Sequence, residues 1–146
     1  MRNGIERYYY NNGNIRSETY HLNDKYHREN GPAIISYYEN GNIKYKSYYK
    51  DNKQHREDGP AIIWYYENGK IEIEAYYLND KYHRENGPAY INYDENGKIE
   101  REYYYLNDNE VRDMLQINKM NNKQEDLIQE NKNTIKTKSR KITILD

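Results

Sequence analysis

The sequence predicts an all-β protein: an antiparallel meander of β-hairpin repeats with a C-terminal helical or partly disordered extension. Two observations carry this prediction. One short motif returns at a constant step of 28 residues, and each copy is followed by two β-rich segments around an Asn-Gly pair. A fixed period of about 20 to 50 residues is typical of a repeat array, and Asn-Gly between such segments is a strong hairpin signal.

The repeated motif is His-Arg-Glu-Asn/Asp-Gly-Pro-Ala, and the Asn-Gly pair keeps the same step. We therefore expect a repeat domain over residues 1–108, with a truncated first unit and further units near 27–54, 55–82 and 83–108. Residues 109–146 are expected to form a separate helical or mobile tail. The positions interpreted as structural are His27, Gly31, Pro32, Gly41, His55, Gly59, Pro60, Gly69, His83, Gly87, Pro88 and Gly97.

The third unit shows how each hairpin is expected to pair. Residues 61–66 and 71–77 are the strands, and residues 67–69 form a three-residue turn with Gly69 in the left-handed region. The side expected to be buried is formed by the pairs Tyr65–Ile71, Ile63–Ile73 and Ala61–Ala75. Trp64, Glu72 and Glu74 are then expected on the opposite, solvated side.

Composition excludes several classes of protein. Hydrophobic residues make up 35% of the chain, with 20 Tyr, no Phe and no Cys. Such a chain is too poor in aliphatic residues for a thick enzyme core, and disulfides and thiolate metal sites are excluded. No apolar run is long enough to span a membrane, and no signal peptide is recognisable. We therefore expect a cytoplasmic protein, or one of the virion or host cytoplasm if it is viral.

Neither the histidines nor the carboxylates predict a catalytic, metal or cofactor site. Equivalent histidines of neighbouring hairpins lie about 9.6 Å apart in a meander, whereas Zn²⁺ needs its histidine nitrogens at about 2 Å. The carboxylate pair Glu72 and Glu74 is replaced by Lys44 and Lys46 in the second unit. A position that changes sign between repeats is typical of a solvated surface, so we expect no enzyme.

The tyrosines give the best functional signal. Tyr and Trp are favoured at protein interfaces because they combine a large apolar area with a polar tip. The candidate interaction surface is Tyr38, Trp64, Tyr66, Tyr76, Tyr90 and Tyr104. The leading interpretation is a non-enzymatic scaffold for another protein. The alternative is a carbohydrate or cell-surface ligand. Nucleic acid is not expected, because residues 1–110 are net acidic.

Two segments resemble known families. The stretch Tyr37-Tyr38-Glu39-Asn40-Gly41-Asn42-Ile43-Lys44, with its copies around Gly69 and Gly97, resembles the MORN repeat variant of bacterial proteins often described as antitoxin-like. The His-Arg-Glu-Asn/Asp-Gly-Pro-Ala element resembles repeat proteins of phages and large DNA viruses. This resemblance implies a hairpin array used in binding and scaffolding, without catalytic residues. It adds a further alternative, antitoxin-like neutralisation of a partner protein.

The tail differs from the repeats in being net basic. Asn107 is the expected helix N-cap, and Val111, Met114 and Leu115 follow at helical spacing. We expect residues 110–120 to dock on the last hairpin as a cap, with residues 130–146 mobile.

Overall fold

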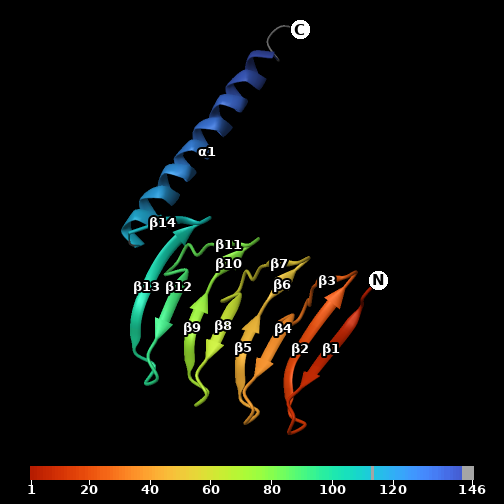
Figure 1. Cartoon of the computed structure of the whole chain (residues 1–146). Helices are drawn as coiled ribbons and strands as arrows, with labels where there is room; N and C mark the ends of the chain where they lie inside the picture. The colour runs from red at the N-terminus through yellow and green to blue at the C-terminus, as the bar shows by residue number, and fades with distance from the viewer. Residues whose placement is uncertain (113, 143–146) are drawn as a thin grey trace. The chain divides into compact units, whose positions relative to one another are not determined.

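A computed structural model describes residues 1–112 and 114–142 and shows a long antiparallel meander (Figure 1). The chain divides into two compact units, Met1–Arg112 and Asp113–Asp146. The first unit is a sheet in the order β1-β2-β4-β5-β8-β9-β12-β13-β14, with β3 paired to β2. The predicted all-β hairpin meander is therefore confirmed.

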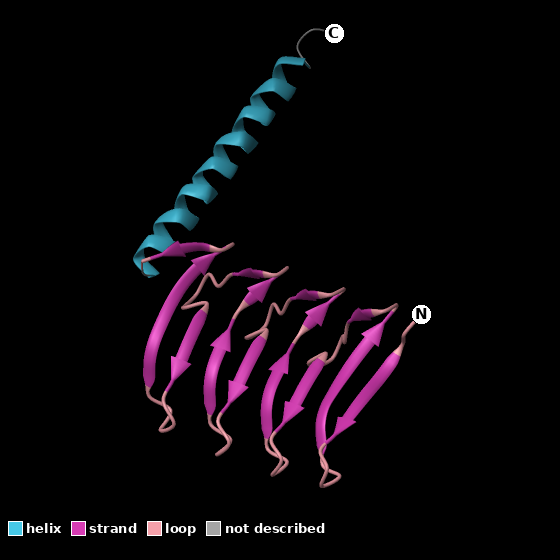
Figure 2. Ribbon diagram, viewed as in Figure 1, coloured by secondary structure: helices cyan, strands magenta, loops and turns pink. Residues whose placement is uncertain are grey.

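The main strands are β1 (Gly4–Tyr9), β2 (Ile15–Leu22), β4 (Ile34–Tyr37), β5 (Ile43–Ser47), β8 (Ile62–Tyr65), β9 (Ile71–Ala75), β12 (Tyr90–Tyr93) and β13 (Ile99–Leu106). The short strands are β3 (Lys25–Tyr26), β6 (Tyr49–Lys50), β7 (Lys53–Gln54), β10 (Tyr77–Leu78), β11 (Lys81–Tyr82) and β14 (Asn109–Val111). Figure 2 shows the turns of the main hairpins at one end of the sheet and the short strands at the other. Each repeat thus supplies one long and one short hairpin.

The turn of each main hairpin has the predicted three-residue form. The backbone N–H of Gly69 donates to the carbonyl oxygen of Tyr66 (2.9 Å), and the N–H of Tyr66 donates to the carbonyl oxygen of Lys70 (2.9 Å). Gly69 has φ +84°, and the equivalent glycines of the other three turns have φ between +86° and +90°. The predicted left-handed glycine is confirmed.

The predicted register is correct next to the turn and wrong beyond it. Tyr65 lies opposite Ile71, as expected. The two expected pairs that do not form are Ile63–Ile73 and Ala61–Ala75, since Ile63 lies opposite Glu74 and Ile62 opposite Ala75.

A β-bulge causes this difference. The register shifts between Trp64 and Tyr65, so Trp64 lies opposite Ile73 and leaves Glu72 as an extra residue on β9. Side chains alternate along a strand, so one extra residue reverses every face beyond it. Glu74 therefore shares the face of buried Ile63, and Trp64 lies on the other face. The same shift occurs between Tyr8 and Tyr9, between Ser36 and Tyr37, and between Asn92 and Tyr93.

The short hairpins were not predicted from the sequence, and two-residue turns close them. In Asn79-Asp80 both residues have positive φ, +52° and +67°, which is the geometry of a type I′ turn. The N–H of Asp80 donates to the carbonyl oxygen of Gln54 in the preceding short hairpin (2.9 Å), and the carboxylate of Asp80 accepts from the N–H of Gln54 (2.7 Å). These reciprocal bonds connect successive repeats.

A thin stripe of buried side chains runs along one face of the sheet, and Ala75 and Ser47 are buried on the other face. The alanine after each proline of the motif is fully buried, and the isoleucine two residues later is 6–9% exposed. These residues are Ala33, Ala61 and Ala89 together with Ile35, Ile63 and Ile91. The predicted Ala-x-Ile stripe therefore forms the interior.

The C-terminal end of the repeat unit extends beyond the expected boundary. The expected helix start at Asn107 is wrong, because Asn107 and Asp108 form a fourth two-residue turn and β14 follows. Val111, expected on a helix, lies opposite Tyr104 and is 3% exposed. The reason is that Asn-Asp suits both a helix N-cap and a type I′ turn, and β14 adds ladder hydrogen bonds to β13.

The second unit holds helix α1 (Met114–Ile142). Its side chains at Met120, Leu127, Ile128 and Ile135 are exposed. The side chains of Met114 and Leu115 lie outside the described residues. Within the described part of the chain, no helix has both the length and the apolar character needed to cross a membrane.

Candidate functional site

Each motif histidine lies against the two-residue turn of the following repeat. Nδ1 of His27 accepts a hydrogen bond from the N–H of Asp51 (3.3 Å), and Nδ1 of His55 accepts one from the N–H of Asn79 (3.3 Å). Nδ1 of His83 lies 3.1 Å from the amide oxygen of the corresponding asparagine. Among the described residues, no group of three or more His, Asp or Glu is arranged to hold a metal ion. The histidines thus connect repeats.

Each motif arginine stacks on a tyrosine of the preceding hairpin. Cζ of Arg84 lies 3.9 Å from the centre of the Tyr76 ring, and Nη1 donates to the carbonyl oxygen of Pro88 (3.1 Å). A Cβ on Gly87 would lie 3.1 Å from Cζ of Arg84, so glycine leaves room for the guanidinium. The equivalent pairs are Arg28 with Tyr20 (3.8 Å) and Arg56 with Tyr48 (4.1 Å).

Two clefts of about 610 and 520 Å³ lie between successive motif loops. Equivalent residues form the walls of both clefts, namely the His-Arg-Glu-Asn/Asp segments of adjacent repeats. Since equivalent residues line both clefts, we attribute these clefts to the stacking of repeats.

One face of the sheet, the repeated face, changes little between repeats. We define it by the alanines and isoleucines of the core, by Tyr37, Tyr65 and Tyr93, and by the charged positions Glu18, Lys46, Glu74 and Glu102. Cross-strand pairs form one row through the middle of this face, in which charged side chains alternate with isoleucines. The row runs Glu18, Ile35, Lys46, Ile63, Glu74, Ile91 and Glu102. A charged side chain next to isoleucine needs an interaction partner, and Glu18, Lys46 and Glu74 each have one. Glu102 is exposed to solvent.

The carboxylates of the repeated face accept hydrogen bonds from an arginine and from tyrosine hydroxyls. Nε of Arg7 donates to Oε1 of Glu18 (2.8 Å), and the Tyr37 hydroxyl donates to Oε2 (2.9 Å), and these bonds lower the pKa of Glu18. Burial, reinforced by the bond to Glu18, raises the pKa of Tyr37 to about 12. Tyr93 donates to Glu74 (2.9 Å) and likewise has its pKa raised to about 12, chiefly by burial.

Two residues of the predicted interaction surface connect repeats. The Tyr38 hydroxyl donates to the carbonyl oxygen of Tyr65, and the Tyr66 hydroxyl donates to that of Tyr93, both at 2.7 Å. Tyr10 makes the equivalent bond from the first repeat (2.6 Å). We call Tyr10, Tyr38 and Tyr66 the inter-repeat tyrosines. Their hydroxyls act within the array.

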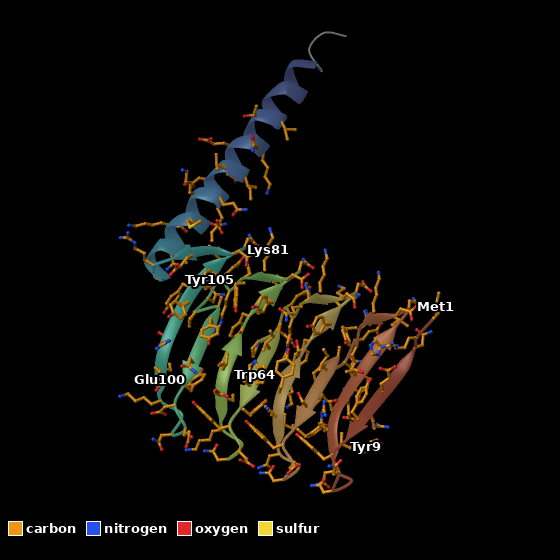
Figure 3. The ribbon with its side chains drawn as sticks, viewed as in Figure 1. Met1, Tyr9, Trp64, Lys81, Glu100 and Tyr105 are labelled. Atoms are coloured by element: carbon orange, nitrogen blue, oxygen red, sulfur yellow. The ribbon has the colours of Figure 1, made fainter. Side chains whose placement is uncertain are left out.

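The other four predicted surface residues lie on two different faces. Tyr76 is stacked under Arg84, and Tyr104 lies two positions after Glu102, on the side of the repeated face. Trp64 and Tyr90 lie on the opposite face, and Figure 3 shows Trp64 near the middle of the sheet. Trp64 and Tyr90 therefore lie together on the face opposite the repeated face.

The face that carries Trp64, which we call the variable face, changes in residue type among the second, third and fourth repeats. Four positions of each repeat form this face. In the order of the second, third and fourth repeats, they hold Ile34, Ile62 and Tyr90; Ser36, Trp64 and Asn92; Tyr45, Ile73 and Arg101; and Ser47, Ala75 and Tyr103. Trp64 is 36% exposed and Tyr103 39% exposed. The centres of the Trp64 and Tyr45 rings are 4.5 Å apart, and those of Tyr90 and Tyr103 are 5.8 Å apart.

Sequence reasoning missed Tyr45, Arg101 and Tyr103 as surface residues. The register expected for the third unit puts Ile73 and Ala75 on the buried side, and the same register puts their equivalents Tyr45, Arg101 and Tyr103 there. The signal that identifies them is the comparison of repeats position by position. The repeated face keeps Ala, Ile and Tyr in the second, third and fourth units, whereas the position shared by Tyr45 and Arg101 and the position of Tyr103 change chemical type.

Comparison with known families gives one finding. The profile of the MORN repeat variant matches residues 2–23, 34–51, 62–79 and 89–107, which together make up more than half of the chain. Comparison with curated proteins and with solved structures found no match. MORN repeats are non-enzymatic modules that generally serve protein interaction or scaffolding. With four matched segments, each on one main hairpin, the chain belongs to the MORN repeat variant family.

Proposed function

We propose that the chain is a non-enzymatic scaffold that binds a partner protein through the variable face. One observation carries this proposal: the two faces of the same sheet differ in how strictly they repeat. Contacts that stack repeats have to recur from unit to unit, and the Ala, Ile and Tyr positions of the repeated face do so in the second, third and fourth repeats. A binding surface for one partner has no such constraint, and each of the four in-register positions of the variable face changes residue type among the second, third and fourth repeats.

The chemistry of the variable face suits a protein partner. Aromatic residues and Arg are enriched at protein interfaces, and Trp, Tyr and Arg dominate the residues whose truncation costs most affinity. The variable face carries Trp64, Tyr103 and Arg101 in exposed positions. Arg101 is its only charged residue, which disfavours a phosphate-rich nucleic acid as partner.

Site-specific photocrosslinking tests the proposal. A photoreactive phenylalanine analogue placed at residue 64 reports on the variable face, and the same analogue at residue 102 reports on the repeated face as a matched control. In extracts of the source cells, we expect a discrete protein adduct from position 64 and none from position 102. Equal crosslinking from both positions, or an adduct from position 102 alone, would contradict the proposal.

A further inference from the structure

The variable face is hollowed in the fourth repeat. A pocket of about 280 Å³ is lined by Tyr82, Tyr90, Asn92, Arg101, Tyr103 and Tyr105. Its volume is just below that of cavities that enclose a whole small-molecule ligand, about 300 to 1,000 Å³. The pocket is therefore of a size for a single side chain or ring.

Four of the six lining residues, Tyr90, Asn92, Arg101 and Tyr103, are specific to the fourth repeat. Arg101 stands where the third repeat has Ile73, Tyr103 where it has Ala75, and Tyr90 where it has Ile62. Packing of the sheet does not require these residues, since the third repeat forms the same hairpin without them.

Arg101 gives the pocket its charge. It makes no ion pair with any described residue, and its side chain is exposed at the pocket. Its positive charge also acts on the Tyr90 phenol, opposing the rise in pKa that burial causes there. Around it stand four tyrosines and the amide of Asn92, whose Nδ2 donates to the carbonyl oxygen of Glu72 (3.2 Å).

We infer that this pocket binds a carboxylate side chain, Asp or Glu, presented by the partner protein. The guanidinium of Arg101 would pair with the carboxylate, which is the strong, directional interaction of Arg. The rings of Tyr90 and Tyr103 would cover the aliphatic stem and exclude water, which strengthens the pair. This inference rests on the proposed function, because it assigns one contact of the partner that the variable face binds.

The test uses the full chain and two peptides that differ only in charge. Acetyl-Gly-Glu-Gly-amide and acetyl-Gly-Gln-Gly-amide are titrated separately, and chemical shifts of Tyr90, Arg101 and Tyr103 are followed by NMR. We expect the Glu peptide to shift these signals saturably and to bind about tenfold more tightly than the Gln peptide. Arg101→Ile and Tyr103→Ala install residues of the third repeat, so the fold is retained, and each should weaken Glu-peptide binding. Lys98→Gln, an exposed cation outside the pocket, is the matched control and should leave binding unchanged.

Three outcomes would overturn the inference. Equal binding of the two peptides would show that charge is not recognised, and the absence of shifts at the pocket would show that no site exists. Glucuronate binding more tightly than the Glu peptide would assign the pocket to an acidic sugar. Failure here leaves the crosslinking test at residue 64 intact, so the two proposals fail separately.

Discussion

The inter-repeat tyrosines offer a one-atom test of how the array is stabilised. Tyr66→Phe removes only the hydroxyl that donates to the carbonyl oxygen of Tyr93 at 2.7 Å. A hydrogen bond of this kind contributes about 1 kcal/mol net. The bond crosses from one repeat to the next, and the stability of a repeat array depends strongly on such nearest-neighbour terms. We therefore expect Tyr66→Phe to lower the free energy of unfolding by about 1 kcal/mol.

Equivalence of the repeats sharpens this prediction. Tyr10 and Tyr38 make the same bond at 2.6 and 2.7 Å, so each Phe variant should cost the same within error. The three sites are about 9.6 Å apart at two strands per step, a distance at which effects add, so the triple variant should lose about 3 kcal/mol. Tyr8→Phe is the control, since Tyr8 is 54% exposed and makes no hydrogen bond through its hydroxyl within the described residues.

Chemical denaturation followed by circular dichroism measures these differences. A triple variant as stable as the native chain would refute the reasoning. So would a loss for Tyr8→Phe equal to that for Tyr66→Phe, because the effect would then be general to tyrosine and independent of the bond.

Three further predictions concern the turns and the titrating groups. Gly69→Val should lower stability by more than about 1 kcal/mol and Gly69→Asn by less, because φ is +84° and only the backbone is strained; equal denaturation midpoints would contradict this. Tyr37 and Tyr93 should ionise only near pH 12, so their stabilisation, complete below the ordinary pKa of 10, is lost as pH rises from about 10 to about 12; near-ultraviolet absorbance at alkaline pH checks it. Glu18→Gln should cost about 1 kcal/mol at neutral pH. Because the folded state lowers the pKa of Glu18, the difference from the native chain should begin to shrink as pH falls past the ordinary value of 4.5 and vanish below the lowered pKa; unfolding curves at neutral and acidic pH measure it.

The features predictable from the sequence are those that depend on local geometry and on repetition. Gly69 had to adopt positive φ because a three-residue turn requires it, and the structure has that conformation. The alanine and isoleucine stripe was predictable because it recurs unchanged in three units. Both signals lie within a single hairpin and need no knowledge of distant partners.

The register could not be predicted, because it depends on partners in other strands. Segregation of charged from apolar side chains favoured placing Glu74 and Ile63 on different faces of the sheet. The bulge at Glu72 places them together, and the Tyr93 hydroxyl from the next repeat satisfies the carboxylate. A simple polar–apolar alternation does not represent a half-buried carboxylate that is hydrogen-bonded by a neighbouring repeat.

The short hairpins were predictable in principle. The pairs Asn23-Asp24, Asp51-Asn52, Asn79-Asp80 and Asn107-Asp108 keep the 28-residue step, and all eight residues have positive φ. Asn and Asp are the residues other than glycine that adopt this conformation most readily. Treating Asn107 as a helix N-cap overlooked that it belongs to this series, and that error placed the end of the repeat domain too early.

The fourth repeat departs from the others in two ways, and only one of them follows from the end of the array. Asp94 replaces the inter-repeat tyrosine, and its carboxylate accepts from the N–H groups of Asn96 and Lys98 in its own turn. That change suits a unit with no following repeat. Tyr90, in contrast, lies on β12, which is paired on both sides, with β9 and with β13. Its difference from Ile62 is therefore not an edge effect, and it supports a binding role for the fourth repeat that stacking alone does not explain.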